Sequence, residues 1–317
     1  MDIRRVAVAG TGMMGPGIAA VFALAGCEAT IVSRSSENAA RGIAKAQGII
    51  DQLVANGLAE PTQGTAAKAR LQGGADPEAA AQAAQLFVES IAEHVATKQE
   101  YFARLDAAAP DTLLCSNTSG ISITEIAAKC RKPERVMTTH FWNPPHLMPL
   151  VEVVMGQRTD LAAAQTVVAL LRAAGKVAVL VRKDRPGQLG NRFQQALVRE
   201  CISIVEEGIA SAEDVDMAIK AGMGLRFPVY GVFEHADLVG LDLAKAVLDY
   251  VLPDLTTIKS GGPLLEQKVA KGELGAKAGK GFLTWTPEKA DQVRQRRDQF
   301  LMQFLRWQKE GKIGGAA

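Results

Sequence analysis

The segment 139–153, THFWNPPHLMPLVEV, combines a histidine, a rigid turn and a carboxylate. His140 ends a strand-like apolar run, two prolines follow at once, and Glu152 sits in the next apolar run. An imidazole can take up and return a proton near neutral pH, and a carboxylate on its second nitrogen would fix its orientation. On residue types and spacing alone, the pair is either such a base with its orienting partner or a core histidine with satisfied hydrogen bonds.

A second group of residues forms a glycine-rich turn. Gly10, Gly12 and Gly15 have G-x-G-x-x-G spacing within VAVAGTGMMGPGIAAVFALAGCEATIV, between an apolar strand and an Ala-rich helix that leads to a second strand. The first Gly permits a tight turn, the second lets the backbone approach a pyrophosphate, and the third lets the helix pack closely. The turn predicts a dinucleotide site, with Met13 and Met14 among its residues and the amides of the helix N-terminus facing the phosphates.

The residues after the second strand bear on which dinucleotide binds. An Asp or Glu at this place binds the ribose 2′-hydroxyl of NAD, whereas an Arg can accept the 2′-phosphate of NADP. This chain has Ser33 at the expected acidic position and Arg34 directly after it, within TIVSRSSEN. Arg34 could instead stack on the adenine or point to solvent, and Glu37 could still reach the ribose. The cofactor is therefore expected to be NAD or NADP.

The helices and strands that would position these residues can be predicted from the pattern of apolar residues. This pattern changes near Pro186. Before it, short β-branched runs alternate with Ala-rich segments, which is typical of a mostly parallel sheet covered by helices on both faces. Residues 61–83 are read as a loose helical excursion, and the chain after Pro186 as helical to its end. We predict an α/β fold, with a Rossmann-like dinucleotide-binding domain (1–185) followed by an all-α domain (186–317). The candidate strands are RRVAVAG, EATIVS, LFVESI, TLLCSN, RVMTTHF, LVEVV and VAVLVRK, and segments such as 41–56 and 96–109 are candidate helices.

Bulk composition excludes several classes of protein. Of 317 residues, 48% are hydrophobic and 22% charged, and the formal net charge is +2, so no global field favours nucleic acid or an anionic membrane. The four cysteines form no CxxC pair, so neither a disulfide framework nor a metal site is expected. No secretory signal or membrane-spanning run is apparent, and a cytoplasmic location is expected.

Several blocks in order show a resemblance to the L-3-hydroxyacyl-CoA dehydrogenase family. The resemblance implies a nicotinamide-binding Rossmann-like domain, a helical domain that completes the substrate cleft and forms a homodimer, and reversible hydride transfer between a secondary alcohol and the cofactor. The small-molecule substrate it implies is a 3-hydroxyacyl thioester. Besides the Gly-rich start, the blocks are VESIAEHVATKQEYFARLD, SNTSGISITEIA, HFWNPPHLMPLVEVV, RKDRPGQLGNRF, EEGIASAEDVDMAIKAGMG, FEHADLVGLD and GKGF.

The same resemblance assigns roles to single residues. It makes His140 the general base and Glu152 the carboxylate that orients it and stabilises the imidazolium. It makes Ser119 and Asn191 donors to the substrate oxygen, for which the alternatives are a helix cap and an ordinary turn. The remaining positions that we expect in the site are Asn143 for the substrate, and Glu93, Lys98 and Asn117 for the cofactor.

The chain also departs from the acyl-CoA members of the family. Arg226 lies in the long connection GMGLRFPVYGVFEHADL, and the only lysines of the segment 42–84 are Lys45 and Lys68, so few cations could hold a nucleotide phosphate of CoA. The long connection and the segment NPPHLMPLVEVV resemble the small-substrate branch, which includes L-gulonate, carnitine and pyridine-carboxylate dehydrogenases. Arg226 is therefore a candidate ligand for the carboxylate of a free hydroxy acid.

Two other classes of protein are alternatives. A dinucleotide-binding structural protein, like the crystallin-like members of the family, would have no need of a base and its orienting carboxylate. A Lys-dependent β-hydroxyacid dehydrogenase would carry its catalytic Lys in the first helix of the second domain, and GNRFQQALVRECISIVEEG contains none. The leading prediction is an NAD(P)-dependent dehydrogenase.

Overall fold

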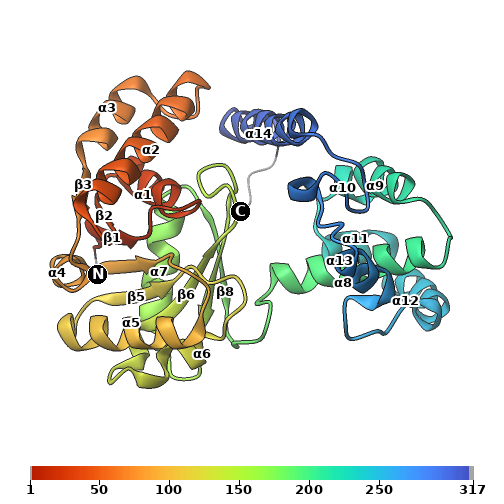
Figure 1. The fold of residues 1–317 in the computed structure, drawn as a ribbon, viewed down its shortest axis with the longest axis horizontal. Coiled ribbons are helices and arrows are strands. Elements are labelled where there is room, and N and C mark those ends of the chain that lie inside the picture. Colours follow the sequence, from red (N-terminus) through yellow and green to blue (C-terminus); the bar gives the residue numbers. More distant parts are fainter. Residues whose placement is uncertain (1, 314–317) are drawn as a thin grey trace. The chain divides into compact units, whose positions relative to one another are not determined.

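The computed structural model describes residues 2–313, and the chain divides into two compact units. The first unit comprises residues 1–191 together with 301–306 of the last helix, and the second contains most of the remaining chain. Figure 1 shows the sheet-containing unit in red to green and the helical unit in green to blue.

The first unit is built on one sheet of eight strands in the order β3-β2-β1-β4-β5-β6-β7-β8. All neighbouring strands are parallel except β6 and β7, which pair antiparallel. The strands are β1 (Arg5–Ala9), β2 (Glu28–Val32), β3 (Leu71–Gly74), β4 (Leu86–Glu89), β5 (Leu113–Ser116), β6 (Val136–Phe141), β7 (Leu150–Met155) and β8 (Val177–Val181). The α/β fold class is thereby confirmed, and all seven candidate strands form.

Helices cover both faces of this sheet, as Figure 1 shows for α1 to α3 on one side and α5 and α6 on the other. One buried apolar cluster packs α1, α2 and α7 on the sheet, and a second packs α4, α5 and α6 on the opposite face. Strands covered on both faces are buried throughout, which is why the sequence shows continuous apolar runs here. The helices are α1 (Gly15–Leu24), α2 (Ser36–Ala55), α3 (Pro61–Ala69), α4 (Pro77–Ala83), α5 (Val95–Ala108), α6 (Ile123–Ile126) and α7 (Leu161–Ala173).

The segment 61–83 differs from the loose helical excursion that was predicted. It contains α3 and α4, but between them Leu71–Gly74 forms β3 and pairs with β2. The sequence LQGG carries no β-branched residue, so no local propensity indicated a strand. It lies at the sheet edge, where Gly73 leaves room for α2: a Cβ there would lie 3.1 Å from Ile43 and 3.3 Å from Ala39.

The antiparallel pair β6–β7 forms the hairpin that the diproline segment predicted. His140 pairs directly with Glu152 in this register, and opposite residues of an antiparallel pair point to the same face. Pro144 and Pro145, both buried, occupy the corner between the strands. The peptide bond between Asn143 and Pro144 is cis.

The second unit is helical. It comprises most of α8 (Gly190–Glu206) and α14 (Pro287–Lys309), together with α9 (Ala212–Ala221), α10 (Met223–Arg226), α11 (Val232–Val239), α12 (Leu241–Val251) and α13 (Gly262–Ala270). Residues 301–306 of α14 belong to the first unit, where Met302 joins a small cluster with Leu53 and Leu147. Among residues 2–313, no helix is both long and apolar enough to cross a bilayer.

Candidate active site

The predicted site residues of the first unit follow the carboxyl ends of its central strands. Strands β1, β4, β5 and β6 are parallel, so the residues that follow them meet at one edge of the sheet. Gly10 follows β1, Ser90 follows β4, Asn117 follows β5, and His140 lies at the end of β6. The topology thus brings the Gly-rich turn and the His–Glu hairpin to the same edge.

His140 and Glu152 form a buried hydrogen-bonded pair. The distance from His140 Nδ1 to Glu152 Oε2 is 2.7 Å, and the two residues are 6% and 0% exposed. The Trp142 indole nitrogen donates to the same carboxylate oxygen at 3.0 Å. The other oxygen, Oε1, accepts from the backbone amides of Leu189 and Gly190 at 2.8 and 2.9 Å. Four donors therefore converge on one carboxylate.

This environment determines the charge of Glu152 and the tautomer of His140. Burial raises the pKa of the Glu152 carboxyl, but the hydrogen bonds from His140, Trp142 and the two backbone amides outweigh it and lower the pKa to about 2. An ionised carboxylate can only accept, so His140 Nδ1 must carry the proton in this hydrogen bond. In the neutral imidazole, Nε2 is then left with its lone pair, which is the state that a general base requires.

The Gly-rich turn fits a dinucleotide. A Cβ at Gly10 would lie 2.3 Å from the Ser90 carbonyl oxygen, and one at Gly15 would lie 1.9 Å from the Gly10 carbonyl oxygen, so only glycine allows the strand, turn and helix to pack this closely. A Cβ at Gly12 would meet nothing within 4 Å, so the backbone there is open to the adjoining cavity. A pyrophosphate needs such an open backbone at a helix N-terminus.

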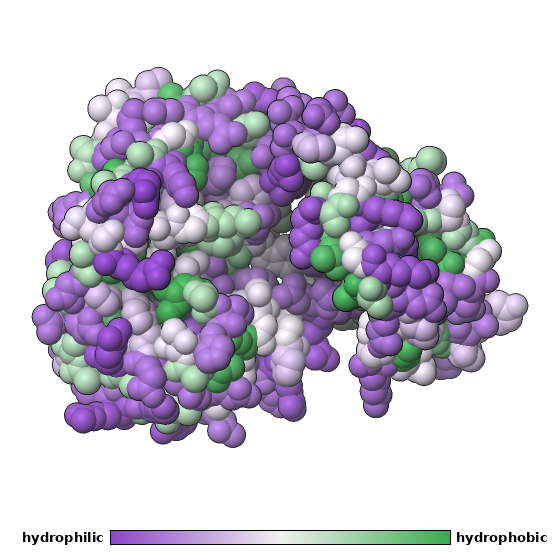
Figure 2. Space-filling model, in the orientation of Figure 1, coloured by the Kyte–Doolittle hydropathy of each residue, from purple (hydrophilic) through white to green (hydrophobic). Residues whose placement is uncertain are grey.

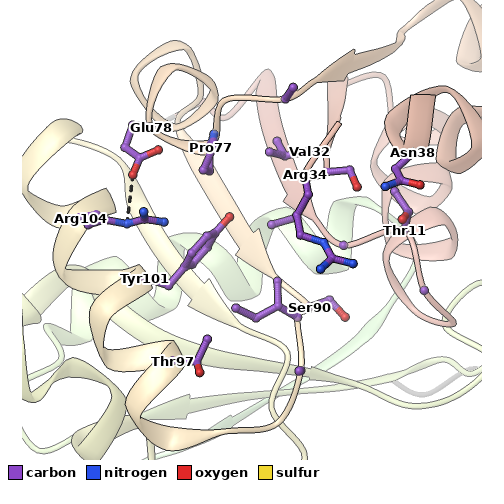
Figure 3. Close-up of a pocket in the computed structure, with 17 residues that line it drawn as sticks. Thr11, Val32, Arg34, Asn38, Pro77, Glu78, Ser90, Thr97, Tyr101 and Arg104 are labelled. Carbon is purple, nitrogen blue, oxygen red and sulfur yellow. Dashed lines mark ion pairs between the residues drawn. The ribbon is translucent and has the colours of Figure 1, made fainter. Parts of the chain in front are cut away.

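A cavity of about 940 Å³ opens beside this turn. Its lining includes Gly10 and Gly12 from the turn, Ser33 and Arg34 after β2, and Tyr101 on α5. Figure 3 shows the Arg34 side chain extended into the cavity, between Tyr101 and the turn residue Thr11. The residues present thus fit an adenosine half with its ribose near Ser33 and Arg34, and the nicotinamide of such a cofactor would supply the acceptor or donor of hydride.

The contacts made by the residues around Arg34 indicate which side chains are available to bind the ribose of the cofactor. Glu37, which could have reached the ribose, instead pairs with Arg41 one helical turn further along α2, at 3.0 Å. The Ser35 hydroxyl caps α2 by accepting from the Asn38 amide. Asn38 itself lines the cavity beside Arg34. At this end of the cavity, the charged side chain that follows β2 is therefore a cation and not a carboxylate.

Asn117, Ser119 and Asn191 are linked by hydrogen bonds around the end of β5. Asn117 accepts from the Phe141 amide at 2.8 Å and donates to the Ser90 hydroxyl at 3.3 Å, which ties three strand ends together. The Asn191 amide group donates to the Ser119 carbonyl oxygen at 2.8 Å. Ser119 is exposed and does not cap a helix, because Ser122 caps α6.

Glu93 and Lys98 also lie at this edge. Glu93 accepts from the Ser119 amide at 3.1 Å and from the Thr118 hydroxyl, and its other oxygen lies 3.2 Å from the Lys98 ammonium. Burial raises the pKa of Glu93, but the bonds from Thr118 and Lys98 outweigh it and lower the pKa. Lys98 is 1% exposed and forms a shorter ion pair, 2.6 Å, with Glu89. This buried ion pair lies at the carboxyl end of β4.

Four predicted site residues lie apart from these contacts. Met13 is 77% exposed, Met14 packs partly into the core, and neither lines the cavity. Asn143 is exposed on the diproline corner. Arg226 belongs to the second unit and ends the short helix α10 where a loop was predicted, because a helical turn forms between Gly222 and Phe227. Its guanidinium carbon lies 5.9 Å from the centre of the Tyr230 ring, which stacks on His235.

Sequence reasoning missed several groups that contact the site residues. Trp142 lies in the segment HFWNPPHLMPLVEVV, and its role depends on Gly190, where a Cβ would lie 2.4 Å from the Trp142 ring. The Leu189 and Gly190 amides left no signal in the sequence, because any residue except proline has such a donor. Glu89 did leave one: a carboxylate that ends an apolar strand must have a partner if it is buried. Within residues 2–313, no cluster of three or more metal-ligating side chains occurs.

Known proteins match this chain along nearly its whole length. Residues 5–185 match the NAD binding domain of 3-hydroxyacyl-CoA dehydrogenase, and residues 187–285 match its C-terminal domain. The 5-formyl-3-hydroxy-2-methylpyridine 4-carboxylate 5-dehydrogenase of Mesorhizobium japonicum is 32% identical over 308 residues, which are 96% of this chain and 98% of that protein. A probable 3-hydroxybutyryl-CoA dehydrogenase of Bacillus subtilis is 37% identical over 284 residues, which are 89% of this chain and 97% of that protein.

A solved structure supports the same relationship. The crystal structure of 5-formyl-3-hydroxy-2-methylpyridine 4-carboxylic acid 5-dehydrogenase, described as an NAD⁺-dependent dismutase, has a TM-score of 0.89 and 32% identity. The match covers 98% of this chain and 99% of that one. Because both domains of one family match in order, and full-length relatives share the fold, the chain belongs to the 3-hydroxyacyl-CoA dehydrogenase family of NAD-dependent oxidoreductases.

Proposed function

We propose that this protein oxidises a secondary hydroxyl to a ketone, reversibly, with His140 as the general base. The observation that carries the proposal is the buried pair of His140 and Glu152, 2.7 Å apart, at the sheet edge that also holds the Gly-rich turn. Four donors keep Glu152 ionised, and an ionised Glu152 keeps the Nε2 lone pair of His140 available. The first candidate substrate is a 3-hydroxyacyl thioester, as in the family.

In the oxidative direction, His140 Nε2 would take the proton of the substrate hydroxyl. Glu152 would stabilise the resulting imidazolium through Nδ1, without itself taking the proton. The Ser119 hydroxyl and the Asn191 amide would donate to the substrate oxygen as it becomes a carbonyl. In the reverse direction the same atoms return the proton.

A panel of substrates tests this proposal. Purified protein would be assayed with 3-hydroxybutyryl-CoA, free 3-hydroxybutyrate and a pyridine carboxylate that carries a 1-hydroxyethyl group, each with NAD and NADP, while the absorbance of the reduced nicotinamide is followed. We expect turnover with at least one alcohol. His140→Ala should abolish it and leave NADH binding, measured by fluorescence, nearly intact. Turnover of His140→Ala at the wild-type rate would disprove the general-base assignment.

A small hydroxy acid is the second candidate substrate, and specific observations favour it. Between Gly42 and Ala84 the only cations besides Arg70 are Lys45 and Lys68; Lys68 pairs with Asp51, and Lys45 donates to the Thr11 carbonyl. The pyridine-carboxylate relative also aligns over a larger share of this chain than the 3-hydroxybutyryl-CoA relative. Arg226 is exposed and could bind a carboxylate bidentately.

Arg226→Met separates the two substrate classes. If the substrate is a free acid, the substitution should raise KM sharply for the acid, and it should leave an uncharged ester of the same compound almost unaffected. Arg158→Met, at another exposed arginine, serves as the control. Equal effects on acid and ester, or activity on 3-hydroxybutyryl-CoA that ignores the substitution, would favour the thioester.

Three finer features belong to the same proposal. NADP is accepted as well as NAD, supported by Arg34 in the cavity and by Ser33 and Asn38, the other lining residues directly after β2, which carry no carboxylate; the carboxylate that lines the cavity from α4, Glu78, pairs with Arg104. The protein is a homodimer through its helical unit, supported by the apolar side chains that this unit exposes. It works in the cytoplasm, supported by four cysteines that are all free thiols.

A further inference from the structure

Lys176 is a buried charged residue that the reaction scheme does not use. It lies just before β8, after the turn that ends α7, and is 8% exposed. Burial lowers the pKa of its ammonium to about 8. Within residues 2–313, its hydrogen bonds go to backbone carbonyls and not to a carboxylate. Burying an ammonium without a counter-ion raises the free energy of the folded state, so a residue of this kind is expected to have a specific role.

Those contacts are with the corner between β6 and β7. The Lys176 ammonium donates to the Pro145 carbonyl at 2.6 Å and to the Met148 carbonyl at 3.0 Å. The next residue, Val177, donates its amide to the Pro149 carbonyl at 3.0 Å. One end of β8 thus binds three carbonyls of the corner 142–149, which links His140 to the strand of Glu152.

The same corner also contacts α1, the helix that follows the Gly-rich turn. A Cβ at Gly17, on the first turn of α1, would lie 2.6 Å from Pro145 Cγ and 3.4 Å from His146 Nδ1. The missing side chain therefore lets α1 pack directly against the corner. The ring of Pro145 thus packs on α1 at Gly17, and its carbonyl accepts from the Lys176 ammonium.

We propose that Lys176 is a positioning residue, which fixes the corner 142–149 and thereby sets the His140–Glu152 pair relative to the dinucleotide-binding turn. The proposal rests on the function proposed above, because it concerns the geometry of His140. Charge-assisted hydrogen bonds to two carbonyls hold the corner in one place. A displacement of about 1 Å in a reacting group can lower a rate by about a hundred-fold.

Kinetics of Lys176→Met test the proposal, because methionine fills a similar volume and has no donor. The probes are acetoacetyl-CoA and free acetoacetate, each reduced with NADH. We expect kcat to fall by about a hundred-fold, while the dissociation constant of NADH changes little. Lys176→Gln, which keeps two donor hydrogens on a shorter side chain, should lose less. Lys132→Met is the matched control, since Lys132 is an exposed lysine whose ammonium donates to the Pro110 carbonyl.

Hydrogen exchange gives a readout that needs no substrate. With NADH bound, Lys176→Met should speed amide exchange in the segment 142–150, and Lys132→Met should not. An unchanged exchange rate there, or faster exchange with a wild-type kcat, would overturn the positioning role. If His140→Ala is inactive while Lys176→Met behaves like Lys132→Met, only this inference fails. If His140→Ala stays active, the proposed function itself fails.

Discussion

The two units of this protein bury their apolar side chains to very different degrees. In the first unit the strands and helices enclose two clusters of buried residues, and Met13, Leu161 and Leu189 are its only exposed large hydrophobic side chains within residues 2–313. In the second unit, helices α8 to α12 contain no buried residue. Figure 2 shows hydrophobic side chains, in green, at the surface of the helical unit.

This difference separates two tasks. The first unit has its own core and can hold buried charges such as Glu152 and Lys98 in fixed geometry. The second unit is amphipathic along its helices but leaves their apolar faces exposed, with Tyr250 at 87% and Phe233 at 86%. Exposed apolar area of this kind marks a surface that associates with something else. We therefore expect the first unit to hold the catalytic base and its carboxylate, and the second unit to mediate association with another protein chain.

The largest expected effect tests the first half of this comparison. Glu152→Gln replaces an acceptor of four hydrogen bonds by an amide that must turn its NH₂ toward His140 or toward the Leu189 and Gly190 amides. In the first case His140 Nδ1 loses its acceptor; in the second it keeps a carbonyl acceptor but loses the negative charge that stabilises the imidazolium. In both cases kcat should fall by about a thousand- to ten-thousand-fold. Steady-state kinetics with the preferred substrate measure this. Glu28→Gln, at an exposed position in β2, should keep the wild-type rate.

The oligomeric state tests the second half. Light scattering at micromolar concentration should report a dimer, because apolar helical faces must be covered. Leu248→Asp, on α12 and 52% exposed, should shift the protein toward monomer and lower its Tm. Leu161→Asp, at an exposed position in the first unit, is the control and should remain dimeric. A wild-type monomer would contradict the assignment of this surface to self-association.

Acid unfolding tests how far the stability of the first unit depends on the buried carboxylate of Glu152. The pKa of Glu152 is lowered from 4.5 to about 2 in the folded state, so its stabilising contribution is present above the unfolded-state pKa and is lost as pH falls through the folded-state pKa. The contribution at neutral pH is about 3 kcal/mol. Urea unfolding of the wild type and Glu152→Gln should therefore differ most near neutral pH and converge toward about pH 2. A difference independent of pH would refute this.

The smallest expected effect concerns the cavity of the first unit. Arg34→Asp should weaken NADPH binding by about ten- to a hundred-fold, because a charge-assisted contact to the 2′-phosphate becomes a repulsive one. NADH binding should change far less, so the preference moves toward NAD. Arg41→Asp, which lies nearby on α2 but does not line the cavity, is the control. An unchanged dissociation constant for NADPH would mean that Arg34 faces solvent when the cofactor is bound.

The sequence by itself determined much of this molecule. Runs such as RVMTTHF and LVEVV became strands, and the diproline corner between them made a hairpin that sets His140 opposite Glu152. The G-x-G-x-x-G turn formed the strand-turn-helix start of the sheet. These features depend on near neighbours, whose side chains and backbone preferences decide strand, turn and helix locally.

Only the tertiary structure decided the rest. LQGG became an edge strand because β2 offers it a partner, not because of its own propensity. The amides of Leu189 and Gly190 reach Glu152 from a segment distant in the sequence, and Lys176 reaches the diproline corner in the same way. The helical character of the chain after Pro186 was predicted from the sequence, but which helix faces stay uncovered was not. Such contacts join residues far apart in the chain, so they exist only once the whole unit has packed.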